Sequence, residues 1–271
     1  MANNIVLSVT ALLALVPASL LPYRRTAARP DLLFWALLAV AVAGPAVASL
    51  VQFAGSWQTG LAGALWISTT ASAALFAVLA VLSRDAWRLA ALLLPYLCVL
   101  AALAVIWGRV PPQGEIAAAP GAWLAVHIVV SVATYALSTL AAVASCAVLV
   151  QERALKRKQP GPLSKSLSRS LPAIVDAERL ELRLLMVAEL VLGAGIVTGM
   201  ALQYLASGQL LAFDHKTILS LLAFAIIGAL LVLQLRSGLR GRRAARLVLA
   251  AYLLLTLAYP GVKLVTDVLI G

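Results

Sequence analysis

The residues best suited to chemistry in this chain are its two histidines, each of which lies near one end of a long apolar run. His127 shares a helix face with polar residues spaced by three or four: Ser131, Thr134 and Ser138, with Tyr135 beside them. A polar stripe on a helix in lipid turns toward other helices or a cavity. Two interpretations stay open: the stripe bonds neighbouring helices as packing contacts, or His127 binds a ligand.

His215 follows Asp214 and precedes Lys216, at the start of a later apolar run. A solvated surface histidine is the simple interpretation. His127 and His215 are nevertheless expected at the same outer level of the bilayer. Neutral imidazole is a common axial ligand of haem iron, and two histidines on two helices would be able to hold a flat macrocycle. A structural zinc site, which takes four ligands, has less support.

Other reactive motifs are missing from the sequence. Cys98 and Cys146 lie within apolar runs and form no CxxC or CxxCH pattern, so neither a thioredoxin-type redox pair nor covalent haem attachment is predicted. No Walker loop, GxSxG or HExxH occurs. We therefore predict a protein that is not an enzyme.

The elements that must position these residues are membrane helices. The chain of 271 residues is 63% hydrophobic and only 11% charged, and its mean hydropathy is +1.02. Its apolar runs are long enough to cross the hydrocarbon core as helices. We expect them at 4–23, 32–53, 61–82, 89–107, 122–150, 184–206, 217–235 and 247–269. The predicted fold is all-α, a polytopic membrane helix bundle of about eight transmembrane helices forming one integral membrane domain over 1–271.

Positive charge is distributed unevenly between the two sides of this predicted bundle. Of the 21 Lys and Arg residues, only Arg109, Lys216 and Lys263 fall outside one set of alternate connections. The positive-inside rule makes that set cytoplasmic and places both termini on the outer, periplasmic side of a bacterial inner membrane. Because the net charge of +11 is explained by topology, we expect the lipid bilayer and no nucleic acid as a partner.

The cytoplasmic connection 151–183 is the largest segment outside the expected spans. Its middle contains Pro160, Gly161, Pro162 and several serines, which predicts a linker, and 176–183 predicts a short helix leading into the next span. Within that span, Glu189 is interpreted either as reaching back toward Arg183 or the membrane interface, or as a buried polar relay. Gly195 and Gly199 predict close packing between helices.

Several blocks in order resemble the integral-membrane cytochrome c assembly proteins, the CcsA and CcmC group, and most closely its YpjD and HemX branch. The similarity is clearest over 120–271, within an assembly-like core of about 60–271. The blocks are 123–128 with Ser131 and Tyr135, 171–172 with Asp176 and 178–180, 192–193, 195–199, Asp214 with Lys216, and 238–243.

This resemblance implies a non-enzymatic protein that binds or presents haem b at the outer face during cytochrome c maturation. It places His127 at an outward-facing axial position, with His215, Ser131, Tyr135 and Asp214 as further candidates for the haem site. The family's tryptophan-rich outer segment is replaced here by 208–216, which has no tryptophan and has His215 where the family has proline. That departure implies a reduced haem site, an accessory role or a regulatory role.

Two other functions are open from the sequence. A membrane regulatory protein, like HemX, would control a haem-biosynthetic enzyme or another maturation protein through the basic 151–183 segment without binding haem itself. A small-solute transporter would require inverted repeats and polar sites at mid-membrane, and neither pattern is seen in the sequence.

Overall fold

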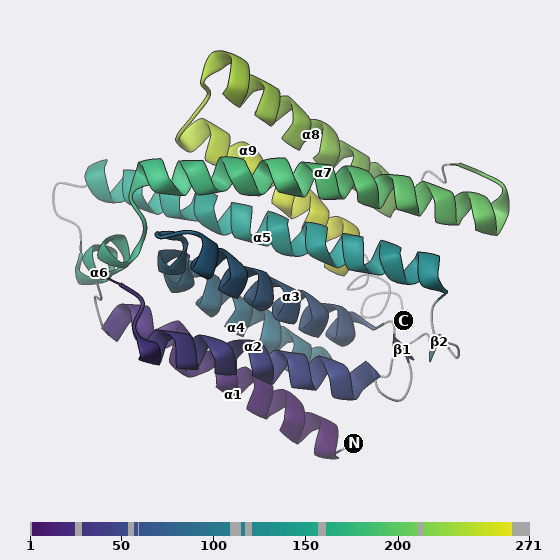
Figure 1. Ribbon diagram of the computed structural model, residues 1–271, viewed down its shortest axis with the longest axis horizontal. Helices are drawn as coiled ribbons and strands as arrows, with labels where there is room; N and C mark the ends of the chain where they lie inside the picture. The colour runs from purple at the N-terminus through teal and green to yellow at the C-terminus, as the bar shows by residue number, and fades with distance from the viewer. Residues whose placement is uncertain are drawn as a thin grey trace.

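The computed structural model describes residues 2–24, 29–53, 57–58, 60–108, 115–116, 121–156, 161–210 and 214–261. Almost all of these residues are helical (Figure 1). The helices of the first half are α1 (Ala2–Arg24), α2 (Leu32–Phe53), α3 (Leu61–Leu82), η1 (Ala86–Leu89) and α4 (Ala90–Trp107). Those of the second half are α5 (Ala122–Lys156), α6 (Pro162–Ser170), α7 (Ile174–Ser207), α8 (His215–Ser237), α9 (Arg242–Thr256) and η2 (Leu257–Gly261).

The predicted polytopic helix bundle is confirmed. In the described part of the chain, α1 to α5, α7 and α8 contain seven segments long and apolar enough to cross a membrane. In lipid each backbone amide must be satisfied within its own segment, which is why apolar runs of this length form helices. The expected eighth span, 247–269, corresponds to α9 and η2, and its residues after 261 lie outside the described part.

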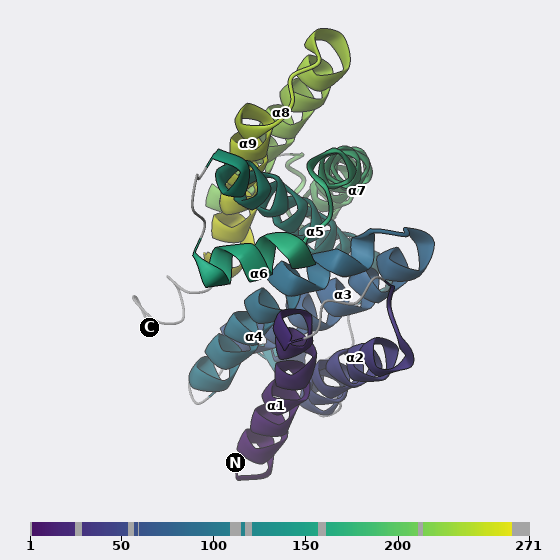
Figure 2. The same ribbon diagram turned by 90° about the vertical axis from the view of Figure 1, so that its left-hand side faces the viewer.

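The helices form two neighbouring groups (Figures 1 and 2). One contains α1 to α4, and the other contains α5, α7, α8 and α9, with α5 and α7 packed side by side. Buried apolar side chains from both groups form one continuous core. Two short strands, β1 (Trp57–Gln58) and β2 (Glu115–Ile116), pair antiparallel at the end of the bundle away from α6.

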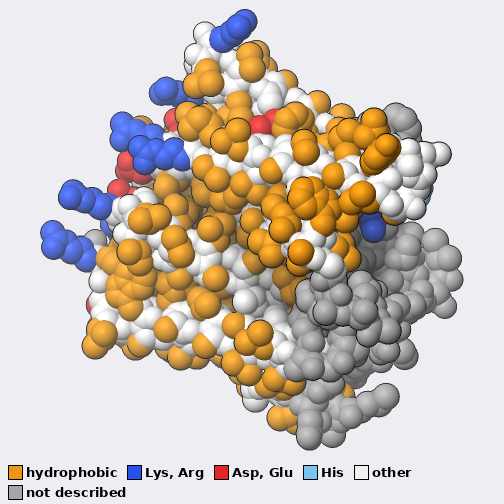
Figure 3. Space-filling view, turned by 45° about the vertical axis from the view of Figure 1, so that its right-hand side comes forward, with side chains coloured by type: hydrophobic (Ala, Val, Ile, Leu, Met, Phe, Trp, Pro, Cys, Tyr) orange, Lys and Arg blue, Asp and Glu red, His pale blue; other side chains and the backbone are white. Residues whose placement is uncertain are grey.

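Lys and Arg side chains gather at the end of the molecule where α6 lies, while apolar side chains dominate the visible flank (Figure 3). We call this the basic end, and the end that carries β1 and β2 the opposite end. The first turn of α1 is at the opposite end (Figure 1). This arrangement agrees with the charge asymmetry of the sequence.

The basic connection between the fifth and sixth predicted spans is more ordered than a linker. Its middle forms α6, which Gln151 of α5 holds by donating from Nε2 to the Ser168 carbonyl at 3.0 Å and accepting from the Ser168 hydroxyl at 2.6 Å. The predicted short helix at 176–183 is the first part of the continuous helix α7. The linker prediction was wrong for Pro162–Ser170, because α6 gains tertiary contacts that composition does not reveal; residues 157–160 lie outside the described part.

Two carboxylates anchor the start of α9 at the basic end. The Gly241 N–H donates to Glu178 of α7 at 2.9 Å, and the Arg242 N–H donates to Glu152 of α5 at 3.0 Å. Gly241 has φ +65°, and a Cβ there would lie 2.8 Å from a Glu152 carboxylate oxygen. The α8–α9 hairpin is therefore fixed to α5 and α7, the two helices with which it encloses a cavity.

Candidate ligand-binding site

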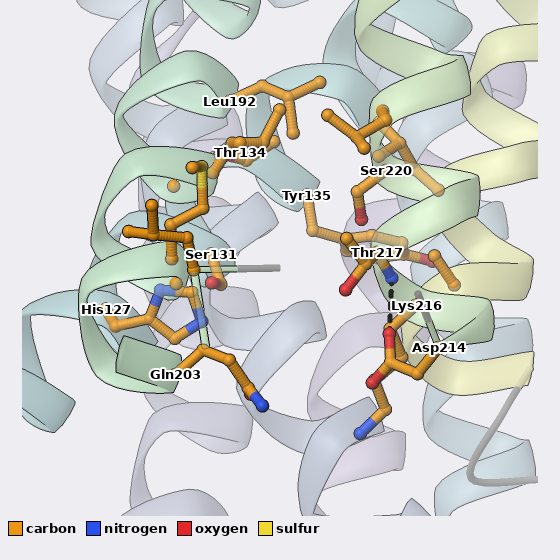
Figure 4. A pocket seen from close by; sticks show the side chains of 18 residues that line it. His127, Ser131, Thr134, Tyr135, Leu192, Gln203, Asp214, Lys216, Thr217 and Ser220 are labelled. Atoms are coloured by element: carbon orange, nitrogen blue, oxygen red, sulfur yellow. Dashed lines mark hydrogen bonds between the residues drawn. The ribbon is translucent and has the colours of Figure 1, made fainter. Parts of the chain in front are cut away.

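A cavity of about 290 Å³ lies between α5, α7, α8 and α9 (Figure 4). The cavity is close to the opposite end of the bundle, the end that carries β1 and β2. Its lining includes side chains from the first turns of α5 and α8 and from the last turns of α7. Much of the wall is apolar, with side chains from α7, α8 and α9 that include Leu192, Ile196, Met200, Leu221 and Leu255. The polar side chains converge from two sides (Figure 4).

His127 lines the cavity from α5. Its Nδ1 lies 3.0 Å from the hydroxyl of Thr198 on α7. That hydroxyl also lies 2.9 Å from the Ala194 carbonyl oxygen and 3.0 Å from the Gly195 carbonyl oxygen. Gly199 lies beneath the ring, since a Cβ there would be 3.1 Å from Cε1 of His127. The imidazole is therefore held by α7 on one side and faces the cavity on the other.

The rest of the α5 stripe divides between the cavity and the protein interior. Ser131, Thr134 and Tyr135 line the cavity, whereas the buried Ser138 is not among its lining residues. The Tyr135 hydroxyl accepts from Tyr252 of α9 at 3.2 Å. Packing contacts and a cavity wall thus occur on the same helix face.

The Tyr135 hydroxyl belongs to a cluster of three phenols. The Tyr252 and Tyr96 hydroxyls are 2.6 Å apart, and Tyr96 comes from α4 in the other helix group. Thr139 lies one turn beyond Tyr135, and its hydroxyl donates to Tyr252 at 3.1 Å. This cluster joins the cavity wall to the first half of the chain.

Across the cavity from His127, the first two turns of α8 contribute Lys216, Thr217 and Ser220, together with Asp214 just before the helix (Figure 4). Asp214 caps α8, and its carboxylate accepts from the Thr217 N–H at 2.8 Å. Partial burial opposes ionisation of Asp214, but the hydrogen bonds from Thr217 and the nearby Lys216 charge hold its pKa below the usual value. This edge of the cavity therefore carries one cation and one anion.

His215 is exposed at the first position of α8 and is not among the residues that line the cavity. His127 is thus the single histidine in the lining. Among the described residues, no three His, Cys, Asp or Glu side chains lie close enough together to hold a metal ion. A metal bound by His127 would have to bring most of its own ligands.

Comparison with known proteins places this arrangement in a family. The profile of the family described as cytochrome C assembly protein matches residues 32–270. The chain belongs to the cytochrome c assembly protein family. The match begins further toward the N-terminus than the resemblance over 120–271 suggested.

A relative of this cytochrome c assembly protein is found in Azospirillum brasilense. It is named an uncharacterized 28.8 kDa protein in the nifR3-like 5′ region, and it is 54% identical over 275 residues that cover all of both chains. No solved structure matches the chain. Family membership supports a role in cytochrome c biogenesis.

Several residues of the site of this assembly protein were not predicted from the sequence. Gly199 and Gln203 of α7, and Thr217 and Ser220 of α8, line the cavity, and Thr198 of α7 contacts the His127 ring. The α7 signal was present, because Leu192, Ile196, Gly199 and Gln203 recur at spacings of four, three and four. Such a stripe shows that these residues share a face, but it does not show which neighbour that face meets.

Proposed function

We propose that this cytochrome c assembly protein binds haem b in the cavity, with His127 as an axial ligand, and handles haem at the outer face of the inner membrane during cytochrome c maturation. The observation that carries the proposal is the imidazole of His127 in the wall of a largely apolar cavity at the end opposite the basic residues. The role is non-enzymatic: the protein holds the group and passes it on.

The residues present suit this group. Haem brings four equatorial nitrogens, so one imidazole suffices to hold its iron on the protein side. The apolar wall suits the macrocycle, and Lys216 supplies a cation for its carboxylates. The volume of about 290 Å³ is just below the usual range of ligand pockets, roughly 300–1,000 Å³. A cavity of this size would enclose only part of the macrocycle. When bound, haem supplies a redox-active iron.

The test is an optical spectrum of the purified protein with and without added hemin. We expect a Soret band for the unaltered chain and at least a roughly tenfold loss of hemin affinity in His127→Ala, because an axial ligand is removed. His215→Ala is the matched control and should keep the band, because His215 does not line the cavity. A colourless protein that takes up no added hemin contradicts the proposal, and equal loss in both variants would indicate ligation by both histidines.

A second candidate is a regulatory protein like HemX that acts on a haem-biosynthetic enzyme or another maturation protein without binding haem. The exposed cations of the basic end favour it: Arg153, Lys156, Lys165, Arg169, Arg179 and Arg183. Among the described residues, one salt bridge is seen, between Arg179 and Asp176 at 3.7 Å. Most of this charge is thus available to an acidic partner. Assignment to the YpjD and HemX branch is part of this proposal.

A further inference from the structure

The hydrogen bonds around Thr198 determine which nitrogen of His127 carries a proton. A hydroxyl has one proton to donate and two lone pairs that accept. The Thr198 oxygen lies within bonding distance of two backbone carbonyl oxygens, those of Ala194 at 2.9 Å and Gly195 at 3.0 Å. Carbonyl oxygens only accept, so the Thr198 proton is directed to them. The Thr198 oxygen must then act as acceptor toward its third neighbour.

That third neighbour is Nδ1 of His127, at 3.0 Å. An oxygen that accepts here requires a proton on Nδ1. A neutral imidazole carries only one N–H, so its lone pair is then on Nε2. Hydrogen bonding by one ring nitrogen is the usual way in which proteins fix the tautomer and orientation of a metal-binding histidine.

Gly199, the next residue on α7, sets the position of the same ring. A Cβ at Gly199 would lie 3.1 Å from Cε1 of His127, whereas a Cβ at Gly195 would lie 3.5 Å from a methyl of Val130, an ordinary contact. The glycine pair that the sequence suggested for helix packing is therefore asymmetric. Gly195 faces an apolar side chain, and Gly199 leaves room for the imidazole.

We propose that Thr198 is a positioning residue that holds neutral His127 in the Nδ1–H tautomer and presents Nε2 as the ligating atom, with Gly199 providing the space for the ring. The use of Nε2 for haem rests on the proposed function. The tautomer itself is a property of the protein without haem and is testable there.

The first test is nitrogen NMR of the haem-free, full-length protein in detergent micelles with ¹⁵N-labelled histidine. The chain has only two histidines, so His127→Ala assigns their ring signals. Spectra are recorded at a pH of about 8.5, above the ordinary imidazole pKa of about 6.5. We expect His127 to have a protonated Nδ1 and an unprotonated Nε2. Protonation on Nε2, or a mixture of both tautomers, overturns the proposal.

Variants at position 198 test whether the Thr198 hydroxyl sets the tautomer of His127. Thr198→Val keeps the branched shape but removes the acceptor, so the signals of His127 should shift toward the Nε2–H tautomer while those of His215 stay unchanged. Thr198→Ser keeps the hydroxyl and should restore the spectrum of the unaltered chain. If valine leaves the tautomer unaltered, Thr198 does not set it. A thermal unfolding transition in detergent like that of the unaltered chain shows that the valine variant is folded.

Hemin titration then connects the tautomer to ligand binding. Loss of a hydrogen bond behind a metal-binding histidine typically costs about 10–100-fold in affinity, so Thr198→Val should bind hemin correspondingly more weakly, and Thr198→Ser should not. If the NMR result holds but no form of the protein binds hemin, the proposed function fails and the tautomer assignment stands. If His127→Ala loses hemin and Thr198→Val does not, the ligating role of Nε2 fails alone.

Gly199→Ala tests the space beneath the ring, with Gly195→Ala as matched control. Both changes add one methyl to the same helix. The 3.1 Å approach at position 199 requires the ring to move, whereas the 3.5 Å contact at 195 does not. We expect shifted His127 ring signals in Gly199→Ala only; the comparison uses these signals and not hemin binding, because Gly195 also lines the cavity. Equal effects at both positions would mean that the glycines serve helix packing alone.

Discussion

At the scale of single residues, the chemistry of the cavity depends on a few polar groups whose partners determine their states. A hydrogen bond with Thr198 orients the His127 ring, and a hydrogen bond from Tyr252 orients the Tyr135 hydroxyl. Asp214, which the sequence placed among the candidate site residues, lines the cavity and also caps α8. Its carboxylate is therefore structural as well as a possible neighbour of a ligand.

The capping role of Asp214 predicts a dependence of stability on pH. Replacing a helix cap by alanine costs about 1 kcal/mol, so Asp214→Ala should lower the thermal stability measured in detergent. Because the folded pKa of Asp214 is lowered, its ionised form stabilises the fold above the unfolded pKa, and this contribution is lost as the pH falls through the folded pKa. The difference between the unaltered chain and Asp214→Ala should therefore shrink at acid pH.

Asp214→Asn is the control, because asparagine also caps helices but does not ionise. Its stability relative to Asp214→Ala should not follow the same acid titration. An unchanged difference between Asp214 and alanine throughout the acid range would show that the carboxylate charge contributes nothing to the cap.

At the scale of elements, two glutamates of α7, Glu181 and Glu189, lie between helices of the bundle. Glu181 is 3% exposed and accepts from the Ser145 hydroxyl at 2.9 Å and from Gln234 Nε2 of α8 at 3.5 Å. Glu189 turns toward α8, where a Cβ on Gly228 would lie 3.0 Å from its Oε1. Of the two interpretations of Glu189, this placement favours a polar group between helices over a side chain that reaches back to Arg183.

The Glu181 contacts predict that α5, α7 and α8 are coupled through Ser145. Removing one partner of a buried polar group costs about 1–3 kcal/mol, so Ser145→Ala should measurably lower the thermal stability in detergent. Ser237→Ala is the control, because Ser237 is exposed and its hydroxyl donates to the Leu233 carbonyl of its own helix. If the two serine variants lose equal stability, the contact with Glu181 contributes little.

At the scale of the whole molecule, the two proposed functions occupy different ends. The cavity lies near the opposite end, while α6 and the exposed cations lie at the basic end. The backbone N–H groups at the start of α9 donate to Glu152 and Glu178. These hydrogen bonds connect the basic end to the α8–α9 hairpin, which forms part of the cavity wall. The separation of the ends allows each function to be removed without touching the residues of the other.

This separation gives a test in living cells. Replacing Lys165 and Arg169 of α6 with glutamine removes exposed charge and leaves the Gln151–Ser168 contacts in place. If the protein acts through haem, cytochrome c maturation should fail in His127→Ala and persist in the α6 variant. If it acts on a cytoplasmic partner, the α6 variant should fail and His127→Ala should not. The proposal of haem handling is contradicted by the second pattern.

The sequence by itself determined the spans and the distribution of charge. Seven predicted spans agree with described helices to within a few residues at most boundaries, the main exceptions being the extensions of α5 and α7 at the basic end. Lipid leaves a long apolar segment no alternative to the helix, and basic residues are retained on one side of the membrane. Both are properties of a single segment and its flanks, which is why they are visible without knowing how segments pack.

Only the tertiary structure decided which residues share a cavity. The stripe that contains His127 was visible from its spacing, but its partner Thr198 lies 71 residues away. Likewise, Asp214 and Lys216 line the cavity while His215 between them does not. The rotation of each helix about its axis depends on contacts with its neighbours, and apolar residues on nearly every face leave that rotation undetermined in the sequence.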